Sequence, residues 1–121
     1  MKVLGIRFCS VTAEAEKLAG FLADGLGLPQ MDLGDDGTEF NGAIFPAGES
    51  WIEVWKQGPQ MPSGIMLQIV VDDADELASV AKTNGVDVSG PIDAHGERIY
   101  YATAPGGLSV SFQSRLGQAD V

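Results

Sequence analysis

The stretch Gln57-Gly58-Pro59-Gln60-Met61-Pro62-Ser63-Gly64 divides the sequence into two halves. Two prolines and two glycines in so short a stretch are typical of a linker rather than of a helix or a strand. On both sides of this linker, the hydrophobic pattern predicts the same order of elements: a strand, a helix and then three strands. The sequence therefore predicts one structural module that is used twice.

The first half opens with a predicted strand over residues 3–9, in which Leu4, Ile6 and Phe8 share one face. Thr12 is expected to cap the following helix, because a threonine hydroxyl can accept a hydrogen bond from a free backbone N–H in the first turn. Gly25 and Gly27 are expected to end that helix. Three further strands are predicted over residues 29–33, 38–45 and 50–56, with a turn at 34–37.

The second half repeats this pattern. A strand is predicted over residues 65–71, and Asp73 with Glu76 forms the signature of a capping box at the start of a helix. Asn84-Gly85 is expected to end the helix. The remaining strands are predicted over residues 86–88, 97–103 and 108–113. The segment 89–91 is expected to break the first of these strands, and His95 is expected to lie in a loop.

Each half is too small to bury its own sheet well, so the two halves are expected to combine. The predicted fold class is α+β: two tandem βαβββ modules form a curved mixed sheet around a cleft, with the helices on the outer face. A single domain is expected over residues 1–115, with module one at 1–57, a linker at 58–63, module two at 64–115 and a tail at 116–121. The expected core on the helix-facing side includes Phe8, Leu108 and Phe112.

The composition excludes several classes of function. The chain has 121 residues and a formal net charge of −10, which argues against binding to nucleic acid or to an anionic membrane surface. No apolar run approaches the length of a membrane span, and the N-terminus turns polar too soon for a signal peptide, so we expect a cytoplasmic protein.

The chain has one cysteine and one histidine. We expect Cys9 to be a small buried hydrophobic residue rather than a nucleophile, because no histidine lies near it in the sequence. We expect His95 to be a solvated loop residue rather than a catalytic base.

The stretch Ser-Trp-Ile-Glu-Val-Trp-Lys, residues 50–56, is the strongest candidate for a functional element. Side chains alternate along a strand, so Trp51, Glu53 and Trp55 share one face. A carboxylate between the only two tryptophans would suit the wall of a pocket. The simpler alternative is an ordinary outer strand, whose tryptophans cover the sheet while Glu53 is solvated.

Several segments resemble the vicinal oxygen chelate superfamily, which includes glyoxalase I, bleomycin resistance proteins and extradiol dioxygenases. These segments are the first strand, Phe21-Leu22-Ala23-Asp24-Gly25-Leu26-Gly27-Leu28, the stretch from Trp51 to Trp55, Val71-Asp72-Asp73-Ala74-Asp75-Glu76-Leu77, Asn84-Gly85-Val86, and Tyr100-Tyr101-Ala102-Thr103-Ala104-Pro105-Gly106-Gly107-Leu108. The resemblance covers residues 2 to 114 and implies the same fold of paired βαβββ modules.

The resemblance also implies where a metal would be held in metal-dependent members. Those ligand positions fall on Gly5, Glu53, Met66 and Ser111, and only Glu53 is a competent oxygen ligand for a hard cation. We therefore predict no metal and no cofactor. The chain resembles instead the metal-free branch typified by bleomycin resistance proteins, which implies a homodimer that holds a small molecule in a groove.

The predicted ligand-binding residues are those placed on the inner face of the sheet: Arg7, Trp51, Glu53, Trp55, Gln68, Ser111 and Gln113. The indoles could stack on an aromatic or cationic compound. Glu53 could pair with a ligand cation or, as we favour, with Arg7. The predicted function is to sequester such a compound, with no catalytic residue.

Three alternatives remain open at this point. The first is a lyase, isomerase or dioxygenase-type enzyme that uses Glu53 with a non-standard metal site or as a general base. The second is a polar, water-filled cleft with no dedicated ligand. In the third, the two tryptophans belong to a dimer interface.

Overall fold

A computed structural model describes residues 1–31, 40–59 and 61–117. The chain divides into two compact units. We call Arg7–Ile65 the Trp unit, because it contains both tryptophans. We call Met1–Ile6 with Met66–Val121 the Tyr unit, because it contains both tyrosines. Each unit is described by itself.

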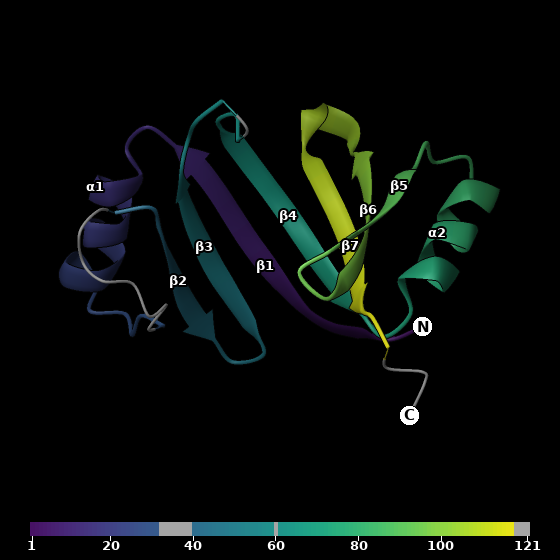
Figure 1. Cartoon of the computed structure of the whole chain (residues 1–121), viewed down its shortest axis with the longest axis horizontal. Helices are drawn as coiled ribbons and strands as arrows, with labels where there is room; N and C mark the ends of the chain where they lie inside the picture. The colour runs from purple at the N-terminus through teal and green to yellow at the C-terminus, as the bar shows by residue number, and fades with distance from the viewer. Residues whose placement is uncertain (32–39, 60, 118–121) are drawn as a thin grey trace. The chain divides into compact units, whose positions relative to one another are not determined.

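The Trp unit contains a helix and three neighbouring strands (Figure 1). Strand β1 (Val3–Thr12) begins in the Tyr unit and continues into the Trp unit. Helix α1 (Ala15–Gly20) continues as the π-helical turn η1 (Phe21–Gly25), and strands β2 (Gly42–Ala47) and β3 (Ser50–Lys56) follow. Strand β3 lies between β2, to which it is antiparallel, and β1, to which it is parallel. The predicted strand over residues 50–56 is confirmed.

The first helix begins later than Thr12, so the predicted cap is wrong. Thr12 is still part of β1, where it pairs with Lys56 of β3. This pairing keeps Thr12 extended, and the helix begins only at Ala15. The Thr12 hydroxyl Oγ1 instead accepts a hydrogen bond from the backbone N–H of Glu14 over 3.1 Å. It therefore organises the turn that precedes the helix.

The strand predicted over residues 29–33 is not found in its described part, residues 29–31. Residues 29–31 are not part of a strand, and residues 32 and 33 lie outside the described part of the chain, as does the turn predicted at 34–37. The next strand, predicted over 38–45, begins at Gly42. Within the described residues, the first half therefore contains three strands rather than four.

The Tyr unit follows the predicted βαβββ order (Figure 1). Strand β4 (Gly64–Val71) leads into helix α2 (Ala74–Thr83). The other elements are β5 (Ser89–Ala94), β6 (Glu97–Thr103), the 3₁₀ turn η2 (Pro105–Gly107) and β7 (Ser109–Arg115). The strand order is β4-β7-β6-β5, with β7 parallel to β4 and antiparallel to β6.

The prediction that residues 86–88 form a strand, which 89–91 then break, is wrong. Strand β5 spans Ser89–Ala94 and contains Pro91. A proline is tolerated there because, among the described strands, β5 lies at the edge of the sheet and pairs only with β6, so no second described strand requires its missing N–H. The pairing is irregular between Ser89 and Ile92. At Gly90, a Cβ would lie 2.9 Å from the carbonyl oxygen of Ile99, so only glycine fits.

A two-residue turn joins β5 to β6. Ala94 pairs with Glu97, and His95 and Gly96 between them have φ values of 55° and 78°. Positive φ at both central residues is the pattern that matches the twist of a tight hairpin. His95 is exposed in this turn, as expected for a loop histidine.

Each unit has its own hydrophobic core. In the Trp unit, Ala15 and Ala19 of α1 pack on Ala43, Phe45 and Val54 of β2 and β3. In the Tyr unit, α2 packs on β6 and β7. Its core contains Val71, Ala74, Ala78, Tyr100 and Phe112. The alanines allow each helix to approach its sheet closely, and the Tyr100 ring stacks on Phe112 with 5.5 Å between centroids.

Only one of the three residues that we assigned to the helix-facing core is buried. Phe112 is 5% exposed, whereas Phe8 and Leu108 are 44% and 40% exposed. The side chains of Leu4 and Ile6 on β1 are exposed to a similar degree. The physical reason is that α1 packs on β2 and β3, and α2 on β6 and β7. The β1 residues of this face belong to neither core.

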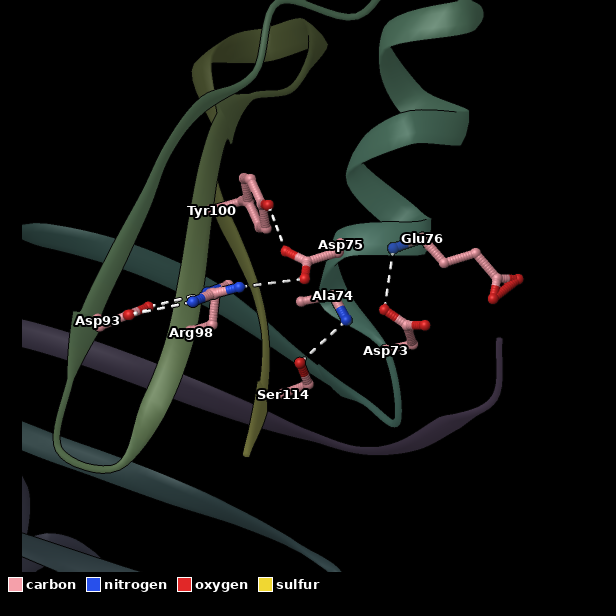
Figure 2. Close-up of polar contacts among 8 residues, drawn as sticks. All are labelled: Asp73, Ala74, Asp75, Glu76, Asp93, Arg98, Tyr100 and Ser114. Atoms are coloured by element: carbon pink, nitrogen blue, oxygen red, sulfur yellow. Dashed lines mark hydrogen bonds and ion pairs between the residues drawn. The ribbon is translucent and has the colours of Figure 1, made fainter. Parts of the chain in front are cut away.

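The predicted cap of α2 is confirmed. Asp73 is the N-cap residue, and its Oδ1 accepts the backbone N–H of Glu76 over 3.0 Å (Figure 2). The Glu76 carboxylate does not complete a capping box; it accepts a hydrogen bond from the amino group of Met1 over 3.0 Å. The backbone N–H of Ala74 is satisfied by Ser114 Oγ of β7, also over 3.0 Å. The first turn of α2 is therefore fixed to strand β7.

A second set of contacts ties α2 to the β5–β6 hairpin (Figure 2). The Tyr100 hydroxyl donates to Asp75 Oδ1 over 2.5 Å, and Arg98 contacts Asp75 Oδ2 over 3.2 Å. Arg98 also binds both carboxylate oxygens of Asp93, over 3.0 and 3.2 Å. These bonds raise the pKa of Tyr100 and lower the pKa of Asp93.

The described elements form a mixed α+β protein, as predicted. Among the residues that the structure describes, no helix combines the length and the hydrophobicity that crossing a membrane requires.

Candidate functional site

Glu53 holds both tryptophans of β3 through its two carboxylate oxygens. Trp51 Nε1 donates to Glu53 Oε2 over 2.6 Å, and Trp55 Nε1 donates to Oε1 over 2.8 Å. The contact follows from sequence spacing, because positions two residues apart on a strand lie on one face. All three side chains are half-buried. Hydrogen bonds to an ionised carboxylate are stronger than neutral ones, so this Trp51–Glu53–Trp55 arrangement, which we call the indole clamp, fixes both rings.

Arg7 lies against the indole clamp from the neighbouring strand. The parallel register places Arg7 opposite Trp51, and the guanidinium carbon lies 4.1 Å from the centroid of the Trp51 ring. This is the geometry of a cation–π interaction. The contacts therefore connect Arg7 to Glu53 through Trp51, and the direct ion pair between Arg7 and Glu53 stays a prediction.

Gly42 is a member of this site that the sequence did not reveal. The antiparallel register places Gly42 opposite Trp55. A Cβ at Gly42 would lie 2.0 Å from Cε3 of the Trp55 ring, so the indole covers the glycine backbone directly. The sequence did offer one signal, a glycine within the predicted strand over residues 38–45. A glycine in a strand often marks a place where another group approaches the backbone closely.

Cys9 lies beside the clamp on the neighbouring strand, opposite Glu53 in the register of β1 and β3. It is 7% exposed and has no disulfide partner among the described residues. Burial raises the pKa of the thiol to about 11, and the negative charge of Glu53 adds to the rise. The thiol is therefore neutral at ordinary pH, which agrees with the expected role as a small buried hydrophobic residue.

The other three predicted ligand-binding residues belong to the Tyr unit. Ser111 and Gln113 are 1% and 3% exposed, and Gln68 lies opposite Ser111 on β4. Ser111 Oγ donates to Gln113 Oε1 over 2.8 Å, and Gln113 Nε2 donates to Glu97 Oε1 over 3.3 Å. The side chains of Ser111 and Gln113 thus have hydrogen-bond partners within the Tyr unit. Their role as ligand contacts stays a prediction.

The four positions that would hold a metal do not fit one. Gly5 has no side chain, Met66 offers a thioether, and Ser111 already donates its hydroxyl proton to Gln113. Both oxygens of Glu53 accept indole N–H groups. Among the described residues, no three His, Cys, Asp or Glu side chains come together as a group that could hold a metal.

Comparisons with known proteins identify the fold. No family model matches the sequence, and no curated protein matches it. Among solved structures, methylmalonyl-CoA epimerase from Mycobacterium tuberculosis aligns with a TM-score of 0.66 and 15% identity, covering 98% of this chain and 91% of that one. A glyoxalase/bleomycin resistance protein/dioxygenase superfamily member from Vibrio splendidus 12B01 aligns with a TM-score of 0.63 and 11% identity, covering 90% and 97%.

A third structure carries an unrelated name. The protein described as NAD-dependent benzaldehyde dehydrogenase from Legionella pneumophila aligns with a TM-score of 0.68 and 12% identity, covering 91% of this chain and 98% of that one. At such identities the likeness shows the fold alone. The chain therefore has the fold of the vicinal oxygen chelate superfamily, as its sequence predicts.

Proposed function

We propose that this protein binds and sequesters a small aromatic or cationic compound without a metal, and that the indole clamp is its binding element. The observation that carries the proposal is the pair of hydrogen bonds, 2.6 and 2.8 Å long, by which Glu53 holds both indoles. Half-buried aromatic rings next to a few fixed polar groups are the usual elements of a small-molecule site.

The clamp supports binding because it fixes the rings before a ligand arrives. Ordering a free side chain on binding costs about 0.5–1.5 kcal/mol, and a ring that is already held avoids most of this cost. Trp51 is held by Glu53 and Arg7, and Trp55 by Glu53 and the close approach of Gly42.

Within this proposal, the contacts favour an aromatic ligand over a cationic one. The guanidinium of Arg7 already lies over the Trp51 ring, where a ligand cation would otherwise stack. A second positive charge beside Arg7 would be repelled, whereas a neutral planar ring can stack on an indole. Metal independence rests on the residue types at the four positions expected to hold a metal.

Calorimetric titration with a matched pair of compounds tests this function. Quinoline is a planar aromatic that is neutral at pH 7.5, and N-methylquinolinium adds a fixed positive charge to the same ring system. We expect quinoline to bind more tightly than millimolar and more tightly than N-methylquinolinium, and we expect Trp55→Ala to weaken binding about tenfold. Trp55→Phe keeps a ring but removes the N–H, so its loss should be smaller.

The matched control is Phe21→Ala, which removes an aromatic side chain that is 58% exposed on η1 of the same unit. It should leave affinity unchanged. The proposal fails if neither compound binds more tightly than millimolar, or if Trp55→Ala binds as the wild type does. Stoichiometric metal in protein purified without a histidine tag would overturn metal independence.

A further inference from the structure

The Tyr unit has a pocket of its own, about 350 Å³ in volume. This is within the range of about 300–1,000 Å³ that is usual for small-molecule sites. The side chains that matter for its chemistry are Met66, Asp87, Ser89, Tyr101, Thr103 and Ser109. None of them belongs to the indole clamp, and every one is part of the Tyr unit.

The strand register explains how these residues come together. Ser109 at the start of β7 pairs with both Met66 of β4 and Thr103 of β6, and Ser89 of β5 pairs with Tyr101. Side chains alternate along β6, so Tyr101 and Thr103 lie on the face opposite to the buried Tyr100. Tyr101, Thr103 and Ser109 therefore lie on the sheet face that α2 does not cover, and Asp87, just before β5, adds to the lining. Ala102 and Val110, which pair with each other between these positions, also line the pocket.

The polar groups of this pocket differ from their neighbours on the same face. Ser111 and Gln113 are buried and hydrogen-bonded to one another. In the described part of the chain, no hydrogen bond or ion pair engages the side chains of the polar residues that line the pocket, which are Asp87, Ser89, Tyr101, Thr103 and Ser109. The two tyrosines differ in the same way: the Tyr100 hydroxyl donates a hydrogen bond to Asp75, whereas no hydrogen bond within the described residues engages the Tyr101 hydroxyl. Hydrogen-bonding capacity is thus available in the pocket.

The chemistry of the lining specifies a class of ligand. Asp87 is the only ionisable group among the lining residues besides the tyrosine hydroxyl, and it is a carboxylate. The hydroxyls of Ser89, Thr103 and Ser109 can both donate and accept hydrogen bonds. The Tyr101 ring and the Met66 thioether supply apolar surface. We propose that this pocket binds a small hydroxylated ammonium compound, such as an amino sugar, with its ammonium group at Asp87 and its hydroxyls at the three hydroxyl side chains.

The net charge of −10 supports this assignment, because an acidic protein attracts cations and raises their concentration near its surface. The assignment does not depend on the indole clamp, since the two sets of residues belong to different units. The two proposals also require different ligands, a planar aromatic compound for the clamp and a hydroxylated cation for this pocket.

Calorimetric titration with D-glucosamine and D-glucose tests the assignment, because the two sugars differ by one amino group in place of one hydroxyl. Glucosamine should bind and glucose should bind at least about tenfold more weakly. Asp87→Asn should abolish this preference, and Tyr101→Ala should weaken both sugars. Asp87 is exposed, so its substitution should leave folding intact, which the thermal unfolding midpoint verifies.

Two controls make the result specific. Asp24→Asn removes one exposed negative charge from η1 and should leave glucosamine binding unchanged. Trp55→Ala should also leave it unchanged, so failure of the clamp proposal and failure of this one are distinguishable. The location is checked by methyl-¹³C NMR of the four methionines, in which glucosamine should shift the Met66 signal and leave that of Met61 in place.

The assignment is overturned if glucosamine does not bind, if it binds no better than glucose, or if Asp87→Asn binds it as the wild type does. An equal effect of Asp24→Asn would also overturn it, because the effect of Asp87 would then be one of net charge alone.

Discussion

Trp55 of β3 fills the space beside Gly42 of β2 that a side chain at position 42 would otherwise take. Trp55 reaches back to Glu53 with its Nε1 atom while the six-membered part of its indole covers Gly42. A side chain on Gly42 and this position of Trp55 exclude each other, because the added Cβ would lie 2.0 Å from a ring carbon. The orientation of Trp55 therefore depends on the absence of a side chain at Gly42 as much as on the presence of Glu53.

Gly42→Ala should therefore destabilise the protein. Forcing a methyl group into this contact should lower the free energy of unfolding by about 1–3 kcal/mol, as overpacking typically does. It should also displace the indole, which the tryptophan fluorescence spectrum would detect. Urea unfolding measures the first effect.

The matched control is Gly20→Ala in α1, where an added Cβ would meet no atom of the described residues within 4 Å apart from its chain neighbours and the backbone of its own helix. Alanine is favoured over glycine in a helix, so Gly20→Ala should leave stability unchanged or raise it. If Gly42→Ala is as stable as Gly20→Ala and its fluorescence is that of the wild type, the close contact between Gly42 and Trp55 is disproved.

The start of helix α2 is anchored by several polar contacts. Asp73 caps it, Ser114 satisfies the N–H of Ala74, and Asp75 links it to Tyr100 and Arg98 (Figure 2). The first turn of a helix has N–H groups without partners inside the helix, and here the side chains of α2 and β7 supply partners. The anchors thus fix where the helix begins.

Asp73→Ala should lower the free energy of unfolding by about 1 kcal/mol, because the N–H of Glu76 loses its acceptor. Urea unfolding of the variant measures this loss. Ser79→Ala, an exposed substitution within the same helix, serves as the control and should be close to neutral. Equal stability of the two variants would show that the cap contributes nothing.

At the scale of elements, the sequence predicts well where local signals agree. The stretch from Ser50 to Lys56 and the Asp73 cap follow from alternation and from capping chemistry. Strand β5 was misplaced because Gly90 and Pro91 are local signals of a break, whereas their tolerance at an edge depends on which strands pair. The late start of α1 has the same origin, since the pairing of Thr12 with Lys56 is not visible in sequence.

At the scale of the whole molecule, stability should depend on pH through Cys9. The pKa of this thiol is raised from its ordinary value of 9.0 to about 11 in the folded protein, first by burial and second by Glu53. Between these pH values the unfolded chain releases a proton that the folded chain retains. The stabilisation is fully present below pH 9 and is lost as the pH rises towards 11.

Comparing the wild type with Cys9→Ala isolates this effect, because other groups titrate in both proteins. Relative to Cys9→Ala, the wild type should lose at most about 1.4 kcal/mol of its free energy of unfolding for each pH unit between 9 and 11. Urea unfolding at pH 8 and pH 10.5 under reducing conditions measures it. A difference that is the same at both pH values would contradict the raised pKa.

The resemblance led to the fold, but the sequence did not show which strands the helices cover. Leu4, Ile6 and Phe8 alternate as a core face should, yet they are 44–45% exposed. Exposed apolar residues on β1 are compatible with the homodimer that the resemblance implies, which stays a prediction. The indole clamp could be anticipated from spacing, whereas Gly42 and Asp87 depended on register and on the true position of β5.

The division of aromatic residues between the two units has a spectroscopic consequence. Trp51 and Trp55 lie in the Trp unit, while Tyr100 and Tyr101 lie in the Tyr unit, and the chain has no other residues of either type. Indole emission therefore reports on one unit, and the phenol bands, separated from the stronger indole bands in the second-derivative absorbance spectrum, report on the other. Following both during a single denaturation reveals, without any label, whether the two units melt as one cooperative body or in sequence.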